Sequence, residues 1–71
     1  MLFKIVAPHR HRAALGERIF WCERHATVTE SGLSIRWSAL EGKILLKGDC
    51  RTLNEAKNLC RGAAGLADSD R

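Results

Sequence analysis

The sequence has no hydrophobic run long enough to cross a membrane. Its longest uninterrupted apolar segments are residues 5–8 and 19–22, whereas a spanning helix needs about 20 apolar residues. The N-terminus also lacks the order of parts of a secretory signal peptide, because its short apolar segment begins at once and the basic residues follow it. We therefore expect no membrane association.

The cysteine count does not suit a secreted disulfide framework. The chain has three cysteines, Cys22, Cys50 and Cys60, and an odd number cannot pair completely within one chain. Disulfides are also rare in reducing compartments. We expect a cytoplasmic protein in which the cysteines pack as small hydrophobic residues.

The motifs of common enzyme and metal sites are missing. The chain has no glycine-rich phosphate loop, no H-E-x-x-H and no G-x-S-x-G. His9 with His11, and Cys22 with His25, are plausible metal half-sites, but structural zinc needs four ligands in paired short spacings. We expect no catalytic residue, no metal and no cofactor.

The composition indicates a single small domain covering residues 1–71. Hydrophobic residues make up 45% of the chain and charged residues 28%, which is typical of a globular protein rather than a disordered one. Twelve Lys and Arg against eight Asp and Glu give a net charge of +4. This balance favours acidic partners without naming one.

The pattern along the chain predicts strands separated by turns. Residues 2–7 form a short strand that Pro8 stops, and residues 9–16 form a loop. Residues 18–30 form a long strand, bent or bulged around residues 23–25. Turn signals at Ser31-Gly32 and Glu41-Gly42 separate two further strands, over residues 33–39 and 43–48.

Two-residue turns at both sites predict one consistent division of the side chains. Val28 then lies opposite Ile35, and Trp37 lies opposite both Ala26 and Leu46. A slip of one residue would mix the two faces. The inward face comprises Ala26, Val28, Ile35, Trp37, Ala39, Ile44 and Leu46, and the polar face His25, Thr27, Thr29, Ser34, Arg36, Ser38, Lys43, Leu45 and Lys47.

A helix near residues 53–62 is expected to cover the apolar face. Thr52 and Glu55 have the capping-box spacing, and the apolar residues that follow recur at helical spacing as Leu53, Ala56, Leu59, Cys60 and Ala63. Gly62 or Gly65 ends the helix, and the chain from about residue 66 is a frayed tail. The fold class is α+β, an antiparallel meander of about four strands covered on one face by a single C-terminal helix. Such a thin core also favours self-association into a homodimer.

Two basic features are candidate partner-binding sites. The first is the loop of residues 9–12, whose guanidinium and imidazole groups suit phosphates or carboxylates. The second is the polar sheet face, where Arg36 lies opposite Lys47 with Lys43 nearby, and like charges so placed destabilise a sheet unless an acidic group compensates. Both features also suit an ordinary solvated surface. The candidate residues are His9, Arg10, His11, Arg12, Arg36, Lys43 and Lys47.

Trp37 belongs to the expected core, whereas the register of Trp21 is not fixed by the sequence. An exposed indole beside the basic residues would serve as an anchor for a partner or a base. Burial in the core is the alternative.

The segments Trp37-Ser38-Ala39, Gly42-Lys43 and Gly48, followed by the helix sequence of residues 52–57, resemble a pattern in small phage and prophage proteins. Some anti-CRISPR proteins, which bind bacterial CRISPR surveillance complexes and block target DNA, look similar over this C-terminal half. The resemblance implies a phage-encoded inhibitor in the bacterial cytoplasm. It carries over no functional residues, because the matching positions are structural.

The sequence thus predicts a non-enzymatic binding protein of phage or mobile-element type. Its most concrete form is an anti-CRISPR-like inhibitor that docks its basic loop and sheet face on an acidic protein surface or a nucleoprotein complex, such as a CRISPR effector. A small basic nucleic-acid-binding domain is the alternative. A structural subunit that dimerises through its sheet edges is the second alternative.

Overall fold

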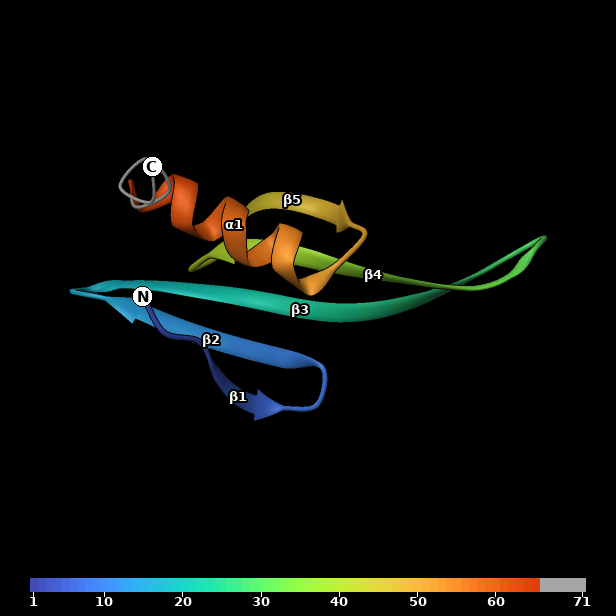
Figure 1. Cartoon of the computed structure of the whole chain (residues 1–71), viewed down its shortest axis with the longest axis horizontal. Coiled ribbons are helices and arrows are strands. Elements are labelled where there is room, and N and C mark those ends of the chain that lie inside the picture. Colours follow the sequence, from blue (N-terminus) through green and yellow to red (C-terminus); the bar gives the residue numbers. More distant parts are fainter. Residues whose placement is uncertain (66–71) are drawn as a thin grey trace.

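A computed structural model describes residues 1–65 as a single antiparallel sheet with one helix. The elements are β1 (Lys4–Ala7), β2 (Arg10–Leu15), β3 (Arg18–Thr29), β4 (Gly32–Glu41), β5 (Ile44–Cys50) and α1 (Leu53–Ala63). The five strands lie in chain order, and α1 packs against β3, β4 and β5 (Figure 1). The α+β class and the helix-covered meander are confirmed, with five strands rather than about four. The expected frayed tail from about residue 66 lies outside the described residues.

The additional strand is β2, which occupies the segment expected to be a loop. A turn at Pro8-His9 joins it to β1, and a turn at Gly16-Glu17 joins it to β3. Gly16 has a φ of 61°, a conformation that glycine adopts at low cost. The loop prediction was wrong because the two turn signals lie at the ends of a strand, in which the buried His11 and Ala13 alternate with the less buried Arg10, Arg12 and Ala14.

The long strand β3 pairs with β4 without interruption. The pairs run from Phe20 with Glu41 to Thr29 with Gly32, so the bulge expected around residues 23–25 is absent. The turn residues are Glu30 and Ser31, one position earlier than expected, and Gly32 adopts a φ of 122°. The pairing is therefore displaced by two residues from the expected register. A displacement of two leaves every side chain on its expected face.

The pairing of β4 with β5 differs more from the expected register. The turn lies at Gly42-Lys43, and register shifts occur on both sides of Ala39. As a result Trp37 lies opposite Cys50, not Leu46, and Lys47 lies opposite Ala39. Leu46 packs against the core as expected, whereas Ile44 is 67% exposed. Extra residues at such irregularities re-aim the side chains that follow them.

The core lies between α1 and the middle of the sheet. Its fully buried side chains include Phe20 and all three cysteines, and a half-buried Trp37 packs against them. On the helix Ala56 and Cys60 are buried, with Leu53 and Leu59 partly buried beside them, but Ala63 is exposed. The core is small because three cysteines and three alanines provide most of its buried apolar side chains.

A side-chain cap stabilises the start of α1, and a glycine in a left-handed conformation follows its end. At the N-terminus, Thr52 Oγ1 accepts a hydrogen bond from the Glu55 amide, and Glu55 Oε2 accepts one from the Arg51 amide. The capping prediction is confirmed, with the return bond going one residue further back than the usual capping box. At the C-terminus the helix ends at Ala63, and Gly65 adopts a φ of 78°, as expected for a glycine that follows a helix.

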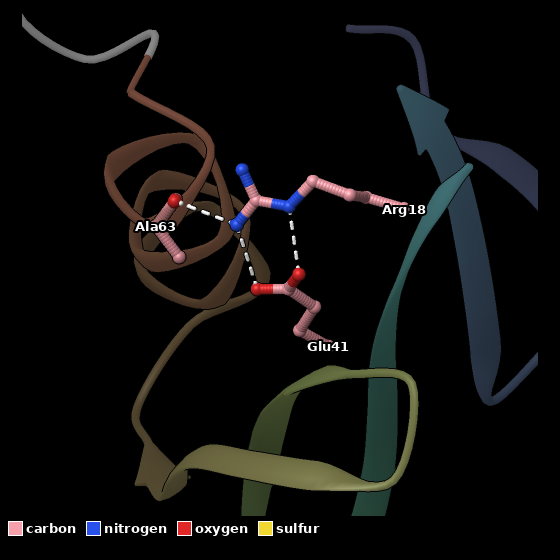
Figure 2. Close-up of polar contacts among 3 residues, drawn as sticks. All are labelled: Arg18, Glu41 and Ala63. Atoms are coloured by element: carbon pink, nitrogen blue, oxygen red, sulfur yellow. Dashed lines mark hydrogen bonds and ion pairs between the residues drawn. The ribbon is translucent and has the colours of Figure 1, made fainter. Parts of the chain in front are cut away.

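An arginine fastens the end of α1 to the sheet. Arg18, at the start of β3, donates two hydrogen bonds to Glu41, at the end of β4, at 2.7 and 2.8 Å (Figure 2). It also donates one to the carbonyl of Ala63 at 2.9 Å. Carbonyls in the last turn of a helix lack partners within the helix. Arg18 therefore satisfies one of them while closing the end of the β3–β4 pair.

The β3–β4 hairpin extends well beyond the helix and the other strands (Figure 1). The pairing of β2 with β3 ends at Glu23, and that of β5 with β4 ends at Trp37. Residues 25–36 therefore form a two-stranded projection, which we call the arm. Val28 and Ile35 were expected in the core but are 83% and 40% exposed. They lie on the expected face, but an 11-residue helix, about 16 Å long, is too short to cover a molecule 41 Å long.

Candidate functional site

The basic residues of β2 are divided between the two faces of the sheet. Arg10 and Arg12 lie on the open face, the face opposite α1, whereas His11 lies on the face that carries α1 and is 8% exposed. The His11 ring meets the Trp37 ring edge-on, with centroids 5.4 Å apart and planes at 89°. Burial lowers the pKa of His11, and the nearby Lys57 charge lowers it further. His11 is therefore a core residue, and its place in a binding loop was wrong.

Trp21 occupies the open face at the centre of a group of charged side chains. It is half-buried and lies between Arg12 on β2 and Leu40 on β4. The Arg10 guanidinium carbon lies 4.3 Å from the centroid of its ring, and that of Arg12 lies 5.9 Å away. Such cation–π contacts contribute roughly 0.5–1 kcal/mol at exposed positions. The sequence did not decide whether Trp21 is exposed or buried in the core, and the structure places it outside the helix-covered core.

Glu23 fixes the position of one of the two arginines. Its Oε2 lies 2.9 Å from Nε of Arg10, which lies opposite it on β2. Arg10 is thus held between a carboxylate and an indole ring, and its charge is partly compensated. Arg12 has no ion-pair partner among residues 1–65.

The structure adds Lys4, which sequence analysis did not single out. Lys4 on β1 lies directly opposite Arg12 on β2, and it also lacks an ion-pair partner within the described part of the chain. Like charges in directly opposite positions destabilise a sheet. Sequence analysis could not pair Lys4 with Arg12, because residues 9–16 were expected to form a loop rather than a strand. We call these residues the Trp21 cluster, comprising Lys4, Arg10, Arg12, Trp21 and Glu23.

Lys47 does not lie on the open face. Its Nζ is 3.3 Å from Glu55 Oε1 on α1, and this contact raises the pKa of Lys47. The pKa of Glu55 is lowered first by the hydrogen bond from the Arg51 amide and then by Lys47. The expected opposition of Arg36 and Lys47 was wrong, because the register shifts of β5 place Lys47 opposite Ala39. Arg36 instead lies opposite His25 on the arm.

The other exposed candidates, His9 and Lys43, lie in turns and are not members of the Trp21 cluster. His9 is in the β1–β2 turn, where its carbonyl accepts a hydrogen bond from the Arg24 amide at 2.7 Å. Lys43 is in the β4–β5 turn, seven residues along the chain from Arg36. Seven residues of strand span about 23 Å. The predicted basic residues are therefore not one surface.

A histidine outside the predicted set is firmly held on the open face. His25 Nε2 lies 3.1 Å from Ser38 Oγ and 3.0 Å from the carbonyl oxygen of Gly48. These contacts join β3, β4 and β5 at the base of the arm. The ring therefore links the base of the arm to β5.

The cysteines are buried and free. Cys22 Sγ lies 4.0 Å from Cys60 Sγ, and Cys60 also contacts the carbonyl of Trp21. The hydrogen bond to Cys60 and burial both raise the pKa of the Cys22 thiol, and burial raises that of Cys50. Both shifts favour the protonated, less nucleophilic form.

Within residues 1–65 the chain forms no cluster of three or more potential metal ligands, and it encloses no pocket. No helix in the same range is long and apolar enough to cross a membrane. The features available for recognition are therefore its exposed faces.

Comparison with known proteins gives no relative from which a function could be transferred. No protein-family model matches the chain. A search of curated proteins and a search of solved structures also find no match.

Proposed function

We propose that this chain is a non-enzymatic binding protein whose open sheet face docks on the anionic surface of a larger assembly through the Trp21 cluster. The observation that carries the proposal is the direct opposition of Lys4 and Arg12 beside Trp21. Two cations in this position repel each other, and neither has an ion-pair partner within residues 1–65. An anionic partner would relieve this repulsion.

The composition of the cluster favours a protein surface as the partner. Tryptophan and arginine are enriched among the residues that contribute most to protein–protein binding. Arg10 is already positioned by Glu23 and Trp21, so little side-chain freedom would be lost on binding.

An inhibitor of a bacterial nucleoprotein complex, as the anti-CRISPR resemblance implies, is the concrete form of this proposal. Such a protein would place Lys4 and Arg12 on an acidic protein surface of the complex, with Trp21 as the apolar anchor. It would act by occupying a surface and would need no cofactor.

Direct binding of single-stranded nucleic acid is the second candidate. The row formed by Lys4, Arg12 and Trp21 on neighbouring strands favours it, because basic side chains beside an aromatic ring suit a backbone with stacked bases. A protein partner and a nucleic-acid partner differ in how strongly the affinity should depend on salt concentration.

The test is capture of partners from a nuclease-treated bacterial lysate by the parent protein and by two single variants. Arg12→Glu should abolish capture of the protein partner. Lys43→Glu makes the same change in net charge in the exposed β4–β5 turn, outside the cluster, and should capture as the parent does. Equal capture by all three proteins would overturn the proposed site.

A titration with a fluorescent single-stranded oligonucleotide separates the two candidates. Phosphate contacts predict binding that weakens steeply with salt, with a slope that falls by about one when Arg12 is changed to Glu. The protein-docking proposal predicts no binding of the free oligonucleotide at physiological salt. Tight, salt-dependent binding would replace it with the nucleic-acid candidate.

A further inference from the structure

The arm exposes an apolar face that α1 does not cover. Val28 is 83% exposed, Leu33 68% and Ile35 40%, and the pairs Val28–Leu33 and Ala26–Ile35 place their side chains next to one another. These residues share the face of the sheet on which α1 lies. The Trp21 cluster lies on the opposite face, so this surface is separate from the proposed binding site.

A projecting pair of strands is a weak structure without a partner. Two-stranded hairpins are marginally stable in water, and they gain stability when one face packs against another layer. Over the rest of the sheet α1 provides that layer, but neither β2 nor β5 extends alongside the arm. The arm therefore needs a layer that the described residues of the same chain do not provide.

The charges at the two ends of the apolar patch identify a suitable partner. Arg24 lies at the base of the arm and Glu30 at its tip, and both are exposed. Neither has an ion-pair partner within residues 1–65. Each is three residues along the chain from Thr27, Arg24 within β3 and Glu30 in the turn that follows it, and three residues of extended chain span about 10 Å.

This spacing makes the arm complementary to a second copy of itself. A two-fold axis at the level of Thr27 and Ser34, which form a cross-strand pair, would superpose the two apolar patches. It would also bring Glu30 of each copy over Arg24 of the other. In a two-fold interface every such contact occurs twice.

We propose that the protein forms a homodimer in which two arms pack antiparallel through their apolar faces, with Glu30 of each copy paired with Arg24 of the other. The arm of the second copy lies in the layer that α1 occupies over the rest of the sheet. The patch has four apolar side chains per copy, Ala26, Val28, Leu33 and Ile35, and is therefore smaller than a standard interface of about 800 Å² per partner. We expect dissociation in the micromolar range.

Sedimentation velocity over a range of concentrations tests the dimer. The parent protein should change from monomer to dimer between about 1 and 100 μM, values that bracket the weak affinity expected of a small interface. Leu33→Ser should weaken association at least about tenfold, because it removes an apolar side chain from the patch of both copies. Thr27→Ser, on the other face of the same arm, should associate as the parent does. A parent protein that is monomeric throughout would overturn the proposal.

A charge exchange tests the arrangement of the two arms. Glu30→Arg should weaken association severalfold, and so should Arg24→Glu, since each places like charges together at both ends of the interface. The double variant E30R/R24E should associate nearly as well as the parent. A double variant weaker than either single variant, or a dimer unaffected by Leu33→Ser, would show that association uses another surface.

The positions chosen are exposed, so the variants should fold. Circular dichroism and thermal melts of the dilute monomers should match those of the parent, and any variant that fails this check is replaced by Val28→Thr, which keeps a β-branched side chain in the strand. Capture of a partner by the Trp21 cluster does not depend on the outcome, because the two surfaces lie on opposite faces.

Discussion

The sulfur of Cys22 on β3 lies 4.0 Å from that of Cys60 on α1, and both side chains are fully buried. The contact joins the centre of the longest strand to the covering helix. Cys50, at the end of β5, is also fully buried. The thiols thus occupy positions that larger apolar side chains fill in a thicker core, and they do so as free cysteines.

The first prediction concerns the reactivity of these thiols. Burial and the raised pKa of Cys22 and of Cys50 should protect both residues from iodoacetamide at neutral pH in the folded protein. Mass spectrometry should show slow modification that becomes complete in guanidinium chloride. Rapid modification of Cys22 under native conditions would contradict the buried position.

The second prediction compares two aromatic residues of the core. Phe20 is fully buried whereas Trp37 is half-buried, so Phe20→Ala should lower the free energy of unfolding by about 3–5 kcal/mol and Trp37→Ala by less. Thr27→Ser, at an exposed position on the open face of the arm, is the control and should change it little. Urea denaturation measures all three. A larger loss of unfolding free energy for Trp37→Ala than for Phe20→Ala would mean that the core is centred on Trp37, near the base of the arm.

The third prediction concerns pH and His11. Its pKa in the folded protein is below the usual value of 6.5, because burial disfavours the charged ring. The unfolded chain therefore binds a proton first, and the contribution of His11 to stability is fully present above pH 6.5 and decreases as the pH falls below it.

Thermal melts at pH 7.5 and at a pH between 5 and 6 measure this effect. The melting temperature of the parent should fall at the lower pH, whereas that of His11→Gln should change less. The carboxylates of Glu41 and Glu55, whose pKa values are lowered, contribute losses only below their usual value of 4.5. Equal pH dependence in both proteins would exclude His11 as the cause.

The fourth prediction concerns the cap of α1. Thr52→Ala removes the acceptor for the Glu55 amide and should cost about 1 kcal/mol in the free energy of unfolding. Thr52→Ser keeps a hydroxyl and should cost much less. Chemical denaturation compares the two variants, and equal losses would mean that the hydroxyl does not support the helix.

The sequence by itself determined most of the local structure. The alternation of apolar and polar residues fixed which face each side chain of β3 and β4 occupies, because a strand has a period of two. The spacing of Thr52 and Glu55 fixed the start of the helix, since its first amide groups need nearby acceptors. The odd number of cysteines also predicted free thiols packed as small apolar residues.

Other features of the fold depended on contacts between distant segments. The turn signals at Pro8 and Gly16 were visible, but basic residues do not by themselves favour a strand. Residues 10–15 form β2 because pairing with β1 and β3 satisfies their backbone groups. That pairing places Lys4 opposite Arg12 and buries His11, and neither result follows from local sequence.

The tertiary structure alone decided which surfaces remain open. Local pattern placed Val28 and Ile35 on the correct face, yet whether they are covered depends on how far the 11-residue helix reaches along a much longer hairpin. Likewise, Lys47 contacts α1 instead of lying on the open face, because the irregular pairing of β5 with β4 changes the direction of the β5 side chains. Periodicity assigns a side chain to a face, but burial depends on which distant segment packs over that face.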